Sequence, residues 1–255
     1  MTATESSHKI VSHEEWERTR KEHLAAEKAF TRQRDELSRQ RRELPWEKVE
    51  KNYVFDGPQG QRTLAQIFGR HSQLLVYHFM FAPTWEEGCR SCSYLADHFD
   101  GMLPHLAHRD VSFAAISHAP LERLQAFQKR MGWRFPWYSA FHTDFNQDYH
   151  VSFTKEEAAA EVEYNYEKMK FGIEEAPGAS AFYKNAAGEV LHTYSTYARG
   201  LDILVGTYNF LDMAPKGRDE DGLKFSMAWV RHHDKYVDDD RVDVSALYQP
   251  PREKP

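Results

Sequence analysis

Two cysteines three residues apart have the clearest capacity for chemistry in this chain. Cys89 and Cys92 are its only cysteines, so they cannot form a disulfide framework that links distant loops. They follow the apolar run 74–81 and begin a segment with helical spacing. Both sulfurs can meet across a first helical turn, where free amide hydrogens stabilise a thiolate. This context predicts that Cys89 is a nucleophile and that Cys92 resolves the mixed disulfide.

The neighbours of the pair should set its reactivity. The charge of Arg90 favours a Cys89 thiolate, while Glu86 and Glu87 oppose it. The residues expected to bind substrate or tune Cys89 are Trp85, Glu86, Gly88, Arg90 and Ser91. The alternative is that both cysteines are small buried hydrophobic residues, which is the common role of free cysteine.

A metal site is the other chemistry that a Cys-x-x-Cys pair can support. A structural zinc site needs four ligands, and His98, His105 and His108 lack the usual spacing after a second motif. Two cysteines cannot hold a four-cysteine iron–sulfur cluster. The acidic and histidine-containing run 232–240 could bind a divalent ion, but a solvated polar tail is favoured. We therefore expect neither a metal nor another cofactor.

The elements around the pair alternate between strand and helix. Strands are expected near residues 53–55, 74–81, 111–117, 180–184 and 189–194, and helices over 64–68, 91–107, 120–131 and 201–213, with a possible short element near 225–230. Two βα units in succession predict parallel strands. The segment 143–177 differs, because it is polar at first and then acidic and helix-prone over 154–169. We treat it as an insertion.

The N-terminal region predicts one long helix over residues 13–44. Ser12 followed by Glu15 indicates a capping box, and no Gly or Pro interrupts the segment before Pro45. Apolar or aromatic side chains recur every seven residues at Trp16, His23, Phe30, Leu37 and Leu44. A single stripe needs one partner, either the chain's own domain or a second copy in a homodimer.

Composition and length limit the remaining possibilities. The 255 residues are 41% hydrophobic and 14% aromatic, which excludes a disordered chain. A net charge of −6 gives no basic face for nucleic acid. The apolar runs fall short of the roughly 20 residues that cross a membrane. No secretory signal is visible, so we expect a cytoplasmic protein.

The expected division is a helical extension over 1–51, one domain over 52–214 and a polar extension over 215–255.

This element order is the layout of thioredoxin-like folds, an α/β class with a mixed central sheet flanked by helices. Residues 75–81, 88–93, 192–200 and 212–218 resemble a bacterial thioredoxin-like family. It is catalogued as a domain of unknown function (eight hundred and ninety-nine) and described as predicted dithiol-disulfide oxidoreductases. The likeness runs from about Val11 to Tyr236. It implies dithiol–disulfide exchange through Cys89 and Cys92. The expected partners are a small disulfide or peroxide substrate, or a thiol reductant.

The chain departs from thioredoxins at two positions. Gly88 precedes the first cysteine where thioredoxins have Trp, and Trp85 is the nearest Trp. Thioredoxins also place a cis-Pro before the strand that faces the cysteines, whereas residues 178–181 contain no Pro and Pro177 comes one or two residues early. Docking of a peptide substrate as in thioredoxin is therefore not expected.

Peroxiredoxins are a second family that the chain resembles, through residues 53–68 and the strand that follows. They need a Pro seven residues and a Thr or Ser three residues before the nucleophilic Cys. Here Pro83 lies six residues and Glu86 three residues before Cys89. A carboxylate at that place would repel the thiolate and could not supply the hydroxyl contact. Reduction of a peroxide by such a peroxidase is the alternative enzymatic function.

Aromatic residues suggest two further roles. A thioredoxin-fold protein that only binds a small ligand could line its site with Trp85, Tyr94, Trp133, Trp137, Tyr194 and Tyr197. The insertion could instead roof Cys89 through Tyr149, Phe153, Tyr164 and Tyr166. A roof would favour small disulfides or peroxides over folded protein substrates, because the incoming sulfur must reach Cys89 in line.

Overall fold

The computed structural model describes residues 8–236, and the chain divides after Pro45 into two compact units. The strands are β1 (Glu47–Lys48), β2 (Val54–Phe55), β3 (Arg62–Thr63), β4 (Gln73–His78), β5 (Val111–Ser117), β6 (Trp137–Ser139), β7 (Val162–Tyr164), β8 (Glu167–Met169), β9 (Gly178–Lys184) and β10 (Val190–Tyr197). The α-helices are α1 (His13–Arg42), α2 (Leu64–Ile67), α3 (Arg90–Ala96), α4 (Phe99–His108), α5 (Leu121–Met131), α6 (Phe145–Asp148), α7 (Lys155–Ala159) and α8 (Gly206–Leu211), with 3-10 helices η1 (Ala198–Leu204) and η2 (His233–Lys235).

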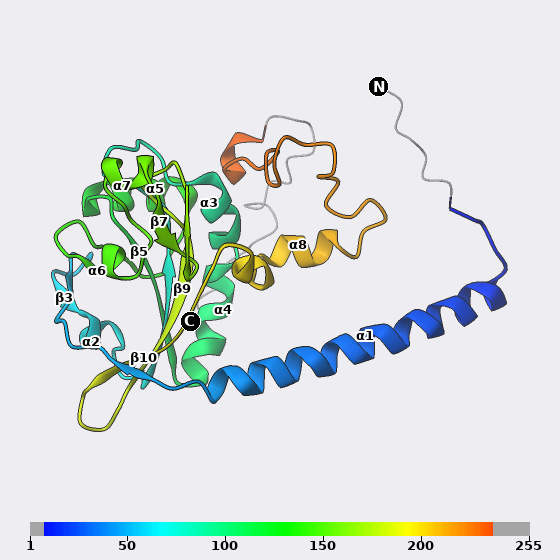
Figure 1. The fold of residues 1–255 in the computed structure, drawn as a ribbon, viewed down its shortest axis with the longest axis horizontal. Coiled ribbons are helices and arrows are strands. Elements are labelled where there is room, and N and C mark those ends of the chain that lie inside the picture. Colours follow the sequence, from blue (N-terminus) through cyan, green and yellow to red (C-terminus); the bar gives the residue numbers. More distant parts are fainter. Residues whose placement is uncertain (1–7, 237–255) are drawn as a thin grey trace, which may run out of the picture. The chain divides into compact units, whose positions relative to one another are not determined.

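The second unit is built on a six-stranded mixed sheet with the order β1-β10-β9-β4-β5-β6 (Figure 1). β4, β5 and β6 run parallel, while β9 pairs antiparallel with β4 and β10 pairs antiparallel with β9. The two βα units therefore give parallel strands, as predicted. The mixed sheet flanked by helices confirms the thioredoxin-like fold class.

The two faces of the sheet are covered by separate hydrophobic clusters. Successive side chains of a strand point to opposite faces. Tyr77 belongs to the cluster on one face, which we call the first cluster, and Val76 belongs to the cluster on the other face, the second cluster. Side chains of α3, α4 and α5 complete the first cluster, which contains Cys92. Side chains of α2, α6 and the insertion complete the second. The cysteine pair thus lies on the face that α3, α4 and α5 cover.

The prediction of one continuous helix over residues 91–107 is wrong, because the segment forms two helices. α3 ends at Ala96 and α4 begins at Phe99. The side chains at the break are tied to other elements: Asp97 accepts a hydrogen bond from Trp133 Nε1 at 2.8 Å, and His98 Nε2 lies 2.8 Å from Thr207 Oγ1. These contacts hold the change of direction immediately after the motif helix.

The acidic stretch 154–169 is not one helix either. Thr154 and Glu157 form a capping box that starts the short helix α7, and a hairpin of β7 and β8 follows. The turn of this hairpin places Asn165 at φ 55° and Tyr166 at φ 65°. Two consecutive left-handed residues are what a type I′ turn requires. This turn, with Val162 and Tyr164 buried, replaces the expected helix with strands.

The C-terminal region also differs from the prediction. The helix expected over 201–213 is divided into η1 and α8, and no regular element forms over 225–230. The solvated tail expected over 232–240 is wrong for His232, which is only 6% exposed, and Val230 just before it is fully buried. Residues 237–240 of this run lie outside the described residues.

The first unit contains α1, which follows the predicted bounds to within two residues. Ser12 Oγ accepts a hydrogen bond from the Glu15 amide at 3.2 Å, as a helix N-cap does. α1 buries none of its residues. The stripe includes some of its most exposed apolar side chains, Trp16, Phe30 and Leu37. Within the described residues, none of the helices is long and apolar enough to cross a membrane.

The unpaired stripe predicts that α1 associates with a second copy of the chain. We expect light scattering to give the mass of a dimer for the full chain and of a monomer after deletion of residues 1–44. Phe30→Glu, in the middle of the stripe, should have the same effect as the deletion. Thr31→Glu adds the same charge beside the stripe and should leave the dimer intact. An oligomeric state unaffected by the deletion would contradict association of the chain through α1.

Candidate active site at Cys89 and Cys92

The two cysteines lie at the start of α3, which follows β4 after the loop 79–88. Cys89 is the N-cap residue and Cys92 lies in the first turn. The Cys89 amide donates to the Met80 carbonyl at 3.0 Å, and its own carbonyl accepts from the Ser93 amide at 2.9 Å. Both cysteines are free thiols, with Cys89 half-buried and Cys92 2% exposed. The backbone therefore fixes Cys89 at the outer position and Cys92 behind it.

The surroundings push the pKa values of the two thiols apart. The Cys92 thiol donates a hydrogen bond to the Cys89 sulfur and, with the backbone amides of Ser91 and Cys92 and the charge of Arg90, lowers the pKa of Cys89 to about 7 against the opposing effect of burial. Burial, followed by the hydrogen bond and charge of Cys89, raises the pKa of Cys92 well above its ordinary value. At neutral pH a large fraction of Cys89 is therefore thiolate, while Cys92 stays a thiol.

Gly88 occupies a position with no room for a side chain. A Cβ there would lie 2.7 Å from the ring of Phe79 and 2.9 Å from the ring of Phe127. Both rings belong to the first cluster. The departure from the Trp of thioredoxins at this position is therefore a packing requirement, because the loop before Cys89 lies directly on two aromatic side chains.

The other residues predicted to tune the pair lie around it with different exposures. Trp85 packs against the first cluster, and its carbonyl accepts from Arg123 at 2.6 Å. Glu86 is exposed. Ser91 is half-buried and contributes its backbone amide to Cys89. The guanidinium of Arg90 lies 5.9 Å from the centre of the Phe225 ring. Of these residues, Ser91 and Arg90 favour the Cys89 thiolate.

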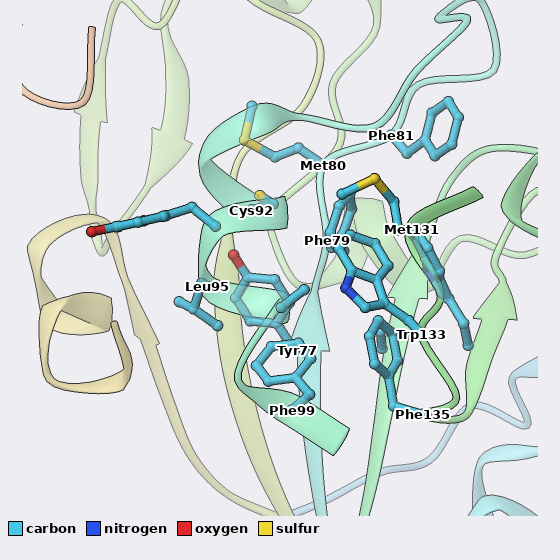
Figure 2. Close-up of a cluster of buried hydrophobic side chains, with 14 of the residues drawn as sticks. Tyr77, Phe79, Met80, Phe81, Cys92, Leu95, Phe99, Met131, Trp133 and Phe135 are labelled. Carbon is cyan, nitrogen blue, oxygen red and sulfur yellow. The ribbon is translucent and has the colours of Figure 1, made fainter. Parts of the chain in front are cut away.

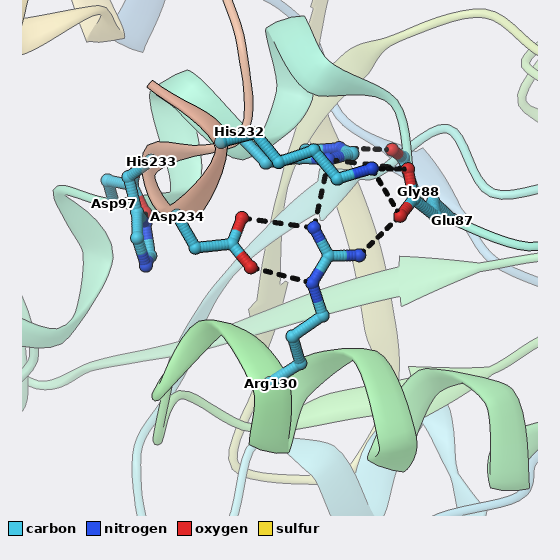
Figure 3. Close-up of polar contacts among 8 residues, drawn as sticks. Glu87, Gly88, Asp97, Arg130, His232, His233 and Asp234 are labelled. Carbon is cyan, nitrogen blue, oxygen red and sulfur yellow. Dashed lines mark hydrogen bonds and ion pairs between the residues drawn. The ribbon is translucent and has the colours of Figure 1, made fainter. Parts of the chain in front are cut away.

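A segment near the C-terminus lies against the loop before Cys89, and we call residues 230–235 the clasp. His232 Nε2 lies 2.9 Å from the Gly88 carbonyl oxygen (Figure 3). Because a carbonyl can only accept, the proton is on Nε2. The His232 ring also packs on Phe127, with centroids 5.2 Å apart. The clasp thus holds Gly88, the residue that precedes Cys89.

Charged side chains fix the C-terminal end of the clasp. Arg130 of α5 makes two hydrogen bonds to the Asp234 carboxylate, at 2.7 and 3.0 Å, and one to Glu87 (Figure 3). Lys235 donates to both oxygens of Glu87 at 2.7 and 2.8 Å. Lys235 and then Arg130 hold the pKa of Glu87 below its ordinary value. The negative charge of Glu87 is therefore matched locally, which reduces its expected opposition to the thiolate.

Three residues around the pair were not predicted from the sequence: His232, Arg130 and Tyr77. His232 and Arg130 have no local signal, because their contacts join segments more than a hundred residues apart. Tyr77 lies inside the predicted apolar strand, and a tyrosine hydroxyl among buried apolar residues was a signal that a polar partner exists. That partner is Cys92 (Figure 2).

Most of the residues expected to roof Cys89 lie elsewhere, although Tyr164 is near enough to the pair that, besides burial, the charge of Cys92 contributes to its raised pKa. Tyr149, Phe153 and Tyr164 pack with the second cluster, and Tyr166 is 70% exposed. The Tyr164 hydroxyl donates to the Pro177 carbonyl at 2.8 Å, so it supports the segment before β9. The part of the chain that packs against the cysteine cluster is the C-terminal region, through residues such as Trp229.

The proposed aromatic wall is divided between both clusters. Tyr94, Trp133 and Trp137 are buried in the first cluster, and Tyr197 is buried in the second. A cavity of about 550 Å³ is present near Pro120 and is lined by none of the six aromatic residues. The four buried rings therefore pack the core, and none of the six lines this cavity. Over residues 8–236, no three His, Cys, Asp or Glu side chains gather as a metal-binding group.

The fold and the paired cysteines define a protein of the thioredoxin-like class. The chain belongs to the family described as "Bacterial protein of unknown function (DUF899)", which it matches over residues 5–236. This confirms the family resemblance that the four sequence blocks indicated. A search of curated proteins gives no match.

Solved structures similar to this chain include peroxiredoxins at low identity. Peroxiredoxin Q of Xanthomonas campestris is 13% identical with a TM-score of 0.44, and the match covers 66% of this chain and 98% of that one. Peroxidoxin BcpB of Mycobacterium tuberculosis is 15% identical with a TM-score of 0.42, covering 64% and 95%. The mitochondrial 2-Cys peroxiredoxin of Plasmodium falciparum is 14% identical with a TM-score of 0.39, covering 66% and 95%.

The clasp predicts different effects for two adjacent histidines. His232→Ala leaves the buried Gly88 carbonyl without its donor, so we expect unfolding in urea to show a loss of about 1–3 kcal/mol. It should also change the rate at which iodoacetamide alkylates Cys89. His233→Ala is the matched control, because His233 contacts Asp97 and not the loop before Cys89. Equal alkylation rates in the wild type and His232→Ala would show that the clasp does not position Cys89.

Proposed function

We propose that this protein is a thiol–disulfide oxidoreductase in which Cys89 is the nucleophile and Cys92 the resolving residue. The observation that carries the proposal is the difference between the two thiols. Cys89 is half-buried with its pKa near 7, while Cys92 is buried behind it with a raised pKa. Exchange needs a reactive thiolate for the first attack and a second thiol within reach for the next.

The reaction begins with attack of the Cys89 thiolate on a disulfide RSSR′. The Cys89 sulfur forms a bond to RS, the substrate S–S bond breaks, and its electron pair leaves with R′S⁻. The Cys92 thiol gives its proton to R′S⁻, which departs as R′SH. The Cys92 thiolate then attacks the Cys89 sulfur and RS⁻ leaves. The protein ends as the Cys89–Cys92 disulfide, the substrate has gained two electrons, and an external thiol restores the dithiol.

Small disulfides are the substrate class that we propose. Cys89 is only partly accessible, and the clasp packs on the residue before it. The incoming sulfur must approach Cys89 in line with the bond that breaks. A short flexible disulfide meets this requirement more easily than a disulfide held in a folded protein.

The reduced protein should react faster with hydroxyethyl disulfide than with insulin. Cys89→Ser should abolish both reactions, because it removes the only sulfur that can start the exchange. Cys92→Ser should stop at a mixed disulfide on Cys89, which mass spectrometry detects. Comparable rates for insulin and the small disulfide would contradict the substrate class, and turnover by Cys89→Ser would contradict the mechanism.

Two further measurements separate the alternative functions. Redox titration with glutathione should give a two-electron midpoint in the range of roughly −120 to −270 mV known for thioredoxin-fold oxidoreductases. A protein that only binds a ligand has no reason to show one. Faster consumption of hydrogen peroxide than of any disulfide would favour the peroxidase.

A further inference from the structure

The sulfur of Cys92 is held between two hydrogen-bond donors at the bottom of the site. Tyr77 projects from β4 toward α3, and its hydroxyl makes a hydrogen bond with the Cys92 side chain (Figure 2). The backbone amide of Met80 donates to the same sulfur. Tyr77 is 3% exposed and Cys92 is 2% exposed, so water does not compete for these contacts.

The arrangement suits a buried sulfur that must become negatively charged. Moving a thiolate out of water is costly unless hydrogen bonds stabilise the charge. Among the described residues, Glu175 has the buried carboxylate. Its two oxygens make hydrogen bonds with His118 and Ser152. Within residues 8–236, no buried carboxylate is therefore free to accept the Cys92 proton. Burial also raises the pKa of Tyr77, which keeps its hydroxyl protonated and able to donate.

We infer that Tyr77 is a catalytic residue of the resolving step, in which its hydroxyl and the Met80 amide donate hydrogen bonds to the Cys92 sulfur as charge develops there. This inference rests on the proposed thiol–disulfide exchange. The proton of the Cys92 thiol passes to the departing R′S⁻, and Tyr77 keeps its own proton throughout. The hydroxyl thus accelerates the second attack and has no part in the first.

Ellman's reagent separates the two steps in one trace. The reduced full-length protein releases a first coloured thiolate when Cys89 attacks, and a second when Cys92 attacks the mixed disulfide on Cys89. Tyr77→Phe removes only the hydroxyl. We expect the first release to keep its rate and the second to slow about tenfold, equivalent to one pKa unit at Cys92.

Tyr197→Phe is the matched control, because it removes another buried hydroxyl that is hydrogen-bonded, in its case to the Tyr149 carbonyl. Tyr197 lies in the second cluster, so both releases should keep their wild-type rates. A general loss of stability would slow both phases or affect both variants. Selective slowing of the second phase by Tyr77→Phe alone distinguishes catalysis from packing.

The outcomes separate this inference from the proposed function. A fast first release with a second release that Tyr77→Phe does not slow overturns the role of Tyr77 only. A first release no faster than that of an ordinary thiol, or one that survives Cys89→Ser, overturns the proposed function. If Tyr77→Phe does not fold, NMR of the reduced wild type decides: a nuclear Overhauser contact between the Tyr77 hydroxyl proton and the Cys92 β-protons is expected, and its absence overturns the inference.

Discussion

The hydrogen bond from the Cys92 thiol to the Cys89 sulfur is the interaction on which the rest of the site depends. It is the largest influence that lowers the pKa of Cys89, and it requires Cys92 to keep its proton. Burial of Cys92 among the aromatic side chains of the first cluster meets that requirement. The two thiols are therefore a coupled pair, in which the packing around one sets the charge of the other.

The fold holds this pair from two directions. On the sheet side, β4 supplies the Tyr77 hydroxyl to Cys92, and the loop that follows β4 supplies the Met80 amide to Cys92 and the Met80 carbonyl to the Cys89 amide. From outside, the clasp fixes the Gly88 carbonyl through His232. Gly88 itself has no side chain because Phe79 and Phe127 fill the space. The position of Cys89 thus depends on strand, core and C-terminal segment together, since the loop between β4 and α3 has little regular structure of its own.

Local signals in the sequence were sufficient for most of the sheet and for the position of the motif. Apolar runs located β4 and β5, a Ser12 cap located α1, and the cysteine spacing located the start of α3. What failed depends on contacts or conformations that spacing does not encode. Asn165 and Tyr166 turn an acidic segment into a hairpin through left-handed backbone angles. His232 reaches Gly88 across 144 residues, and a polar composition near a chain end gave no indication of that burial.

The pH dependence of Cys89 alkylation tests the central claim most directly. Because the pKa of Cys89 is lowered to about 7, the thiolate is present above that pH and is lost as the pH falls through it. The rate of iodoacetamide labelling, located by mass spectrometry, should rise with a midpoint near pH 7 and modify Cys89 first. Cys92→Ala removes the donor and should move the midpoint upward. A midpoint at the ordinary thiol value of about 8.5, unchanged in Cys92→Ala, or earlier labelling of Cys92, would contradict the account.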